Sequence, residues 1–337
     1  MSLTNFLRSS GRWLWGTTPA AEPDRGGRLP RRAGAERSAN RRYCLTLSAQ
    51  SDTAADEHEL ALAWQSLETD MALVPAGDVE LIVPVATGHD GDPLAAAPTR
   101  QVTVRSVYLD RCAVSNADFA LFVAAGGYRD PGHWPAQLLP QVLQFTDRTG
   151  RPGPRYWSDG EPPADKLDHP VVGISWYEAY AYAAWTGKRL PTSAEWQRAA
   201  CWSDGDGTDR RYPWGNSFVP NRANTWLGGP GHTQAVNSYY DGCTPNGIYQ
   251  LVGNVWEWTA TAFECQSDSP NSEVLFDQPM AEVRGGAFDT YFETQATCQF
   301  RSGQPMLRRA VNLGFRCCVS TDSLRKLDQP SAYFDPA

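Results

Sequence analysis

The chain has 337 residues, of which 41% are hydrophobic and 20% charged, a composition typical of globular proteins. Its formal net charge of -8 argues against general nucleic-acid binding, because contacts to the phosphate backbone need a basic surface. No apolar run approaches the roughly 18 residues that cross a bilayer, so membrane insertion is not expected.

Composition changes along the chain and predicts four regions. Residues 1–45, rich in Arg, Gly, Pro and Ala, are expected to form a mobile basic arm, either solvated or in contact with something acidic. Residues 46–70 read as a short helical lead-in, with a helix expected near 54–67. Residues 71–320 are predicted to form one domain, and 321–337 a C-terminal tail.

Within the predicted domain, the first segments read as short strands, and capping residues then predict helices. Ser115 or Asn116 can begin a helix whose apolar face includes Phe119 and Phe122. A long loop with several prolines and tryptophans follows. Beyond residue 203 the pattern predicts turns and short strands rather than helices.

A pair of helices is the clearest signal in the chain. Ser175 can cap the first, and Gly187 can end it. Its apolar face is expected to contain Tyr177, Ala181, Ala184 and Trp185. In the second helix, Thr192 and Glu195 have the spacing of a capping box, in which hydroxyl and carboxylate bond each other's backbone amides.

Eight cysteines are scattered along the chain, and the N-terminus lacks the apolar core of a secretory signal. An even number of cysteines is compatible with disulfides, but this length and these irregular spacings favour free thiols. Free thiols persist in a reducing compartment, so a cytoplasmic location is expected.

Seven motifs occur in a fixed order along the predicted domain. They are SNADFALFV, HPVVGISWYEAYAYAAW, GKRLPTSAEWQRAA, YPWGN, NGIYQLVGNVWEW, VRGGAF and NLGFRC. Together they resemble the signatures of the sulfatase-modifying-factor family, which includes the formylglycine-generating enzymes and the sulfoxide synthases of ergothioneine synthesis. The resemblance implies a variant of the C-type lectin fold, an irregular α+β domain with little regular secondary structure.

Most of these motifs have architectural explanations. In GNVWEW, an extended backbone would place Trp256 and Trp258 on one side and Glu257 on the other. The paired glycines of RGGAF permit close backbone approach or positive φ.

The catalytic chemistry of the resembled enzymes depends on two cysteines that hold copper(I), which favours soft thiolate ligands. By the resemblance, the first cysteine position falls at Thr290, which has no thiol. The second falls near Thr297 or Cys298. Cys298 is therefore the only candidate catalytic residue, and copper is not expected. The five histidines have no i, i+4 pair, so the iron-dependent branch of the family is not indicated either.

The resemblance also implies a structural calcium ion at the GNVWEW loop. The corresponding positions are Gln250, Gly253, Val255 and Glu257. Oxygen ligands of this kind suit calcium, although the loop can equally be held by its own hydrogen bonds. A second family site would begin at Asn224 and Thr225, but its acidic ligand has no counterpart in the short GGPGHT loop.

Two functions remain open. The first is a binding module for a protein or peptide ligand, with contacts from residues 289–309; the candidates are Tyr291, Phe292, Phe300 and Arg308. Its special case is a retroelement-diversified variable protein, in which this region would be hypermutated. The alternative is a metal-dependent oxidase of the formylglycine-generating type with an altered site, acting on a thiol substrate.

Overall fold

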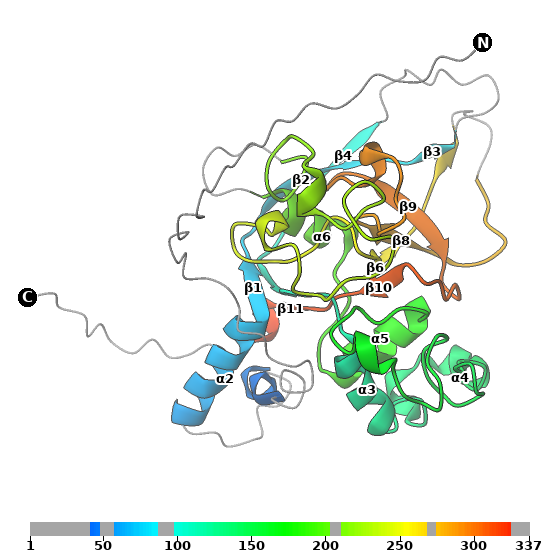
Figure 1. Ribbon diagram of the computed structural model, residues 1–337. Coiled ribbons are helices and arrows are strands. Elements are labelled where there is room, and N and C mark those ends of the chain that lie inside the picture. Colours follow the sequence, from blue (N-terminus) through cyan, green and yellow to red (C-terminus); the bar gives the residue numbers. More distant parts are fainter. Residues whose placement is uncertain (1–40, 48–56, 87–97, 203–209, 268–273, 325–337) are drawn as a thin grey trace, which may run out of the picture. The chain divides into compact units, whose positions relative to one another are not determined.

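The computed structural model describes residues 41–47, 57–86, 98–202, 210–267 and 274–324 (Figure 1). The chain divides into two units, 1–30 and 31–337, and the described residues all belong to the second. Nearly all of the predicted basic arm and most of the predicted tail lie outside them. Within the described ranges, no helix has the length and apolar character needed to cross a membrane.

Regular secondary structure is sparse, as predicted for this α+β fold. The α-helices are α2 (Glu57–Asp70), α3 (Asn116–Ala124), α4 (Leu139–Val142), α5 (Trp176–Trp185) and α6 (Ser193–Cys201). Short 3-10 helices are η1 (Arg41–Thr46), η3 (Pro131–His133), η4 (Ala136–Leu138), η5 (Ala164–Lys166), η6 (Pro220–Arg222), η7 (Tyr240–Gly242), η8 (Glu293–Gln295) and η9 (Thr321–Ser323). Among described residues beyond 203 there is no α-helix, in agreement with the sequence.

The three main helices of the domain begin at side-chain caps. Ser115, Ser175 and Thr192 each accept a bond from the third helical amide, and the acidic residue there bonds back to the cap. The capping box predicted at Thr192 is therefore confirmed. The predicted apolar face of α5 is right at three of four positions, because Ala181 is buried and Tyr177 and Trp185 pack against the core. Ala184 is exposed, whereas Ala179 and Tyr182 also face the core.

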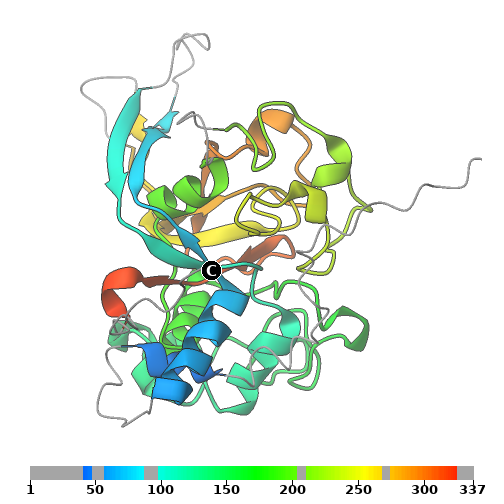
Figure 2. The same cartoon turned by 90° about the vertical axis from the view of Figure 1, so that its left-hand side faces the viewer.

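The strands form four small sheets. They are β1 (Met71–Val74), β2 (Gly77–Ile82), β3 (Val85–Ala86), β4 (Thr99–Val104), β5 (Val107–Asp110), β6 (Trp256–Ala262), β7 (Gln266–Ser267), β8 (Met280–Arg284), β9 (Arg301–Pro305), β10 (Leu313–Phe315) and β11 (Cys318–Ser320). The orders are β1-β5-β11, β10-β6-β8-β9, β2-β4 and β3-β7. Figure 2 turns the view to show the β2–β4 hairpin at its left side.

Strand β6 divides two apolar cores. Trp258 is fully buried in one core beside α3 and α5, and Trp256 packs against the same core. Glu257 points the other way, where the Trp196 indole donates to its carboxylate at 2.8 Å. Trp196 belongs to the second core, beside α6. The alternation predicted for GNVWEW is thus the alternation of this strand.

All eight cysteines are free thiols. The five buried ones are Cys112, Cys201, Cys298, Cys317 and Cys318. Burial raises the pKa of the neighbouring Cys317 and Cys318 well above the usual value for a thiol, so both are held protonated. The cytoplasmic location suggested by the cysteine pattern remains a prediction.

His169 joins two loops of the domain. Its Nδ1 lies 3.1 Å from the Thr233 hydroxyl, and its carbonyl accepts from the backbone amide of Asn116 at 2.9 Å. Burial lowers the pKa of His169 below its ordinary 6.5, because the charged ring would lose hydration.

Stability should therefore fall as the pH drops below 6.5, since the unfolded chain takes up a proton on this ring before the folded chain does. We expect His169→Gln to lose less stability than the parent between about pH 7.5 and about pH 5.5. Urea unfolding at the two pH values measures this. His58→Gln, at an exposed histidine on α2, is the control and should keep the parent's pH dependence.

Candidate functional site

The loop after β8 forms the centre of the candidate site. Gly285 and Gly286 have φ angles of 92° and 77°, a region that side chains rarely adopt. A Cβ on Gly285 would also lie 2.4 Å from the Leu251 carbonyl oxygen. The loop therefore depends on both glycines, and it turns directly over the Thr290 hydroxyl, which would lie 3.2 Å from a Cβ on Gly286.

Thr290 acts as a structural residue of this loop. Its side chain is buried, and its hydroxyl accepts from the Ala287 amide at 2.8 Å. Its carbonyl accepts from the Trp226 amide at 3.2 Å. A threonine at the first cysteine position thus closes a turn and offers no thiolate to a metal.

Cys298, the only candidate catalytic residue, lies in the second core with 0% exposure. Its amide donates to the Arg211 carbonyl, and its carbonyl accepts from Arg284 Nη2 at 2.7 Å. Burial lowers the pKa of Arg284 to about 10. Thr297 beside it is also buried and accepts from the Phe300 amide.

These residues do not fit copper(I), because the RGG loop supplies a hydroxyl where the metal would need a second thiolate. Across the described ranges, no group of three or more histidine, cysteine, aspartate or glutamate side chains converges as a metal site.

Three exposed aromatic rings beside the loop form a row, in which the middle ring contacts the other two. Trp226 is 58% exposed, and Tyr291 and Phe292 are each 60% exposed. The ring centroids lie 6.2 Å apart for Trp226 and Tyr291, and 5.2 Å for Tyr291 and Phe292. We call these three residues the aromatic surface.

The other two predicted contacts lie at different depths. Phe300 is half-buried, with its ring centroid 6.0 Å from that of Trp256, so it faces the body of the domain. Arg308 is exposed on the loop after β9. That loop is tied to the aromatic surface segment by Asn312 Nδ2, which donates to both carboxylate oxygens of Asp289.

Trp226 is not among the contacts that the sequence predicts. It directly follows Asn224 and Thr225, which the family resemblance relates to calcium and not to recognition. The available signal was its place in a Gly- and Pro-rich loop, TWLGGPG, since such loops run over the surface. Its pairing with Tyr291 depends on a contact 65 positions away in sequence, which no local pattern shows.

The predicted calcium residues are engaged within the protein. Arg316 holds Glu257 through two bonds of 2.7 and 2.8 Å, and Trp196 donates to the same carboxylate. The Gln250 side chain donates to two backbone carbonyls and accepts from Asn254. Both Glu257 and Arg316 are essentially unexposed.

The remaining two calcium positions contribute only backbone groups. Gly253 donates to the Gly285 carbonyl, and its own carbonyl accepts from the Val255 amide. The set therefore fits calcium poorly, because its single carboxylate is already neutralised by Arg316. Calcium at this loop stays a prediction that the geometry does not favour.

Comparison with known proteins matches residues 58–321 to the family described as "Sulfatase-modifying factor enzyme 1-like domain". The chain belongs to this family. The inactive C-alpha-formylglycine-generating enzyme 2 of Bos taurus is 32% identical, over 74% of this chain and 87% of the relative. The formylglycine-generating enzyme of Thermomonospora curvata is also 32% identical, over 76% of this chain and 95% of the relative.

The relatives of this sulfatase-modifying-factor domain thus include one named as inactive and one named as an enzyme. Among solved structures, that of CarF matches with a TM-score of 0.50 and 20% identity, covering 75% of this chain and 98% of that one. This likeness supports the shared fold, and the family resemblance drawn from the motifs is confirmed.

We expect Glu257→Gln to lower the free energy of unfolding by about 3–5 kcal/mol, because it leaves a buried guanidinium without its counter-ion. Chemical denaturation measures this. In the parent, millimolar calcium and chelator should give the same melting temperature, since a ligand that binds the native state would raise it. A calcium-dependent rise that Glu257→Gln abolishes would restore the calcium prediction.

Proposed function

We propose that this domain is a binding module that recognises a protein or peptide ligand through its aromatic surface. The observation that supports the proposal most is the exposure of Trp226, Tyr291 and Phe292 as one contiguous cluster. Large aromatic side chains left in water forgo the stabilisation that burial gives, whereas a partner that covers them gains it. Trp, Tyr and Arg are also the residues enriched at binding hot spots.

The backbone beneath the aromatic surface is well supported. Trp226 is bonded to Thr290, Thr290 closes its own turn, and Asp289 is held by Asn312. A surface held in this way loses little conformational entropy on binding, which favours affinity. At the position of an oxidase's first cysteine, Thr290 instead supports the backbone beneath the proposed recognition surface.

The alternative is an oxidase with altered chemistry that uses Cys298. The similarity to a formylglycine-generating enzyme supports this alternative. Against it stand the full burial of Cys298 and the hydroxyl at position 290. Reactive thiols in proteins are usually partly exposed, and the buried Cys298 thiol does not meet this condition, although the charged Arg284 side chain interacts with it electrostatically.

The retroelement-diversified variable protein is the special case of the binding proposal. In that case the segment around the aromatic surface would differ among copies of the gene. An adenine-rich template copy of the 289–309 region near the gene would identify it.

Alanine substitution tests the aromatic surface. The binding partner is first captured with the parent protein. Its binding should be weakened by about 2 kcal/mol, roughly a 30-fold rise in Kd, in each of three variants: Trp226→Ala, Tyr291→Ala and Phe292→Ala. Phe300→Ala should act mainly through stability, because its ring packs against Trp256. Titration calorimetry with the purified partner gives the affinities.

Tyr180→Ala is the matched control, since Tyr180 is a partly exposed tyrosine on α5. It should leave the affinity unchanged, and Arg308→Ala should show an intermediate loss. Each variant must first melt cooperatively. Parent-like affinity in all three surface variants would place recognition elsewhere.

A separate measurement distinguishes the oxidase alternative. We expect the parent to form no tight one-to-one copper(I) complex and to leave a cysteine-containing peptide unoxidised, because Thr290 cannot supply a thiolate. Competition with a chromophoric copper(I) chelator and mass spectrometry of the peptide measure the two outcomes. A tight complex that Cys298→Ser abolishes would favour the oxidase.

A further inference from the structure

The paired strands β2 and β4 form a surface that is separate from the aromatic surface. Strands β1 and β5 pair with Val74 opposite Val107, and β2 and β4 pair with Gly77 opposite Val104. The register is the same in both pairs, so β1–β2 and β5–β4 form one long two-stranded ribbon interrupted at residues 75–76 and 105–106.

A third strand covers only half of this ribbon. Strand β11 pairs with β5 on the side opposite β1, and Ser320 faces Val107 at its end. The chain then turns away in η9, where the Thr321 hydroxyl donates to the Ser106 carbonyl. Beside β4, the position that would continue β11 is taken by no described strand, and Figure 2 shows β4 as the outer strand of the hairpin.

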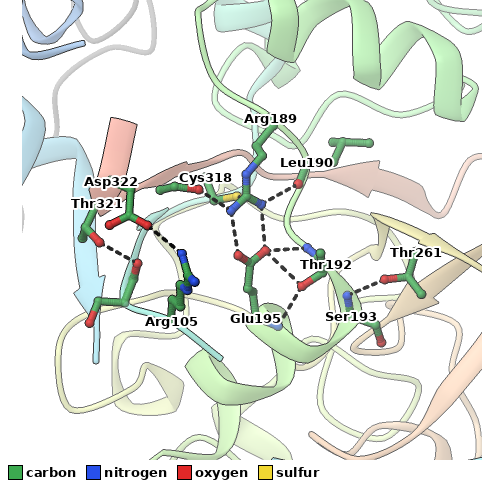
Figure 3. Close-up of polar contacts among 12 residues, drawn as sticks. Arg105, Arg189, Leu190, Thr192, Ser193, Glu195, Thr261, Cys318, Thr321 and Asp322 are labelled. Carbon is green, nitrogen blue, oxygen red and sulfur yellow. Dashed lines mark hydrogen bonds and ion pairs between the residues drawn. The ribbon is translucent and has the colours of Figure 1, made fainter. Parts of the chain in front are cut away.

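A cavity of about 330 Å³ lies at that position. It is lined by Val102, Thr103, Val104, Arg105, Ser106, Thr192, Ala194, Glu195, Ser320 and Asp322. Successive strand residues point to opposite faces, so a cavity lined by five consecutive residues follows the backbone edge of β4. Figure 3 shows two pairs of charged residues at this cavity, in which Arg189 holds Glu195 and Arg105 pairs with Asp322.

The free edge of β4 presents backbone groups for pairing. Val83 N donates to Pro98 O, so the hydrogen-bonded pairs of the hairpin alternate from there, and Gln101 and Thr103 direct their N–H and C=O groups away from β2. On the other edge, Gln197 of α6 donates to the Glu80 carbonyl, which agrees with this alternation. No described residue bonds to the outward backbone groups of Gln101 and Thr103.

Charge indicates what kind of strand would fit. Asp78 and Glu80 lie on the same exposed face as Thr103 and Gln101, their partners in the register. Their carboxylates accept from the hydroxyls of Thr103 and Thr99, at 2.6 Å each, and neither has an ion-pair partner among the described residues. Two unpaired carboxylates at i and i+2 match basic side chains at i and i+2 of a neighbouring strand.

We propose that the edge of β4 binds an extended peptide segment with basic residues at alternate positions, which adds as the third strand of the ribbon in the place that β11 leaves. The peptide backbone bonds to Gln101 and Thr103, and its basic side chains reach across β4 toward Asp78 and Glu80. Strand addition of this kind takes affinity from main-chain hydrogen bonds and specificity from alternate side chains.

The test uses a fluorescein-labelled peptide of alternating lysine and valine and the full chain. Fluorescence anisotropy should show saturable binding that weakens at high salt. Methylating alternate peptide amides, on the edge that faces β4, should weaken binding about tenfold or more, because it removes the shared hydrogen bonds. Methylating the other alternate amides is the matched control and should leave binding nearly unchanged.

Variants of the protein test both contacts. Asp78→Asn with Glu80→Gln should reduce affinity about tenfold and remove most of the salt dependence. Gln101→Pro removes an outward N–H that the hairpin does not use, a position where edge strands tolerate proline, and it should abolish binding. In the parent, hydrogen exchange at the Gln101 and Thr103 amides should slow about tenfold or more when the peptide saturates the protein.

Equal binding of the two methylated peptides, or unchanged exchange at Gln101 and Thr103, would overturn the proposal. If Gln101→Pro does not fold, the comparison of the two methylated peptides with the parent protein still tests the proposal. Sedimentation of the free parent tests whether a second copy of the chain occupies the edge of β4 instead. A dimer that protects the Gln101 and Thr103 amides, and that the peptide does not dissociate, would overturn the proposal in favour of edge-to-edge pairing between two copies of the chain.

Discussion

The buried guanidinium of Arg316 is the interaction on which the arrangement of the domain depends. Besides the Glu257 carboxylate, it donates to the carbonyls of Asp110, Arg111 and Tyr249, which belong to the end of β5 and to the loop before β6. A charge removed from water is tolerable only when its donors are matched in this way. Because Arg316 fixes β6 and the adjoining loop, it also fixes Gly253, whose amide bonds Gly285 of the RGG loop. The position of the aromatic surface therefore depends, through these contacts, on the buried side chain of Arg316.

The proposed recognition surface adjoins the loop that would carry the first cysteine of an oxidase. The RGG loop keeps its two left-handed glycines, while Thr290 satisfies the turn internally and the residues beyond it point into solvent. The same loop could serve the chemistry of an oxidase only if position 290 carried a thiolate directed at a second sulfur. A backbone shared with enzymes is thus compatible with a different task, since function resides in side chains placed on a fold.

The sequence predicted the features that depend on local chemistry. The caps at Ser115, Ser175 and Thr192 are short-range hydrogen bonds, and the alternation in GNVWEW is intrinsic to an extended strand, so both could be inferred from neighbours in the chain. The ordered motifs indicated the family. The pairing of Arg316 with Glu257 and the contact of Trp226 with Tyr291 join distant segments, and no periodicity reports them. The sequence indicates that Glu257 has oxygens suited to calcium, but it does not show that Arg316 already pairs with them.

The eight thiols make it possible to measure how often the domain unfolds locally. Five lie in the interior, and three, at Cys44, Cys243 and Cys265, are partly accessible. An alkylating reagent can reach the interior sulfurs only when the packing around them loosens, so the rate of their modification reads the frequency of that event. Because Cys298 and Cys201 belong to one core while Cys317 belongs to the other, separate labelling rates would reveal whether the two halves come apart together or in sequence.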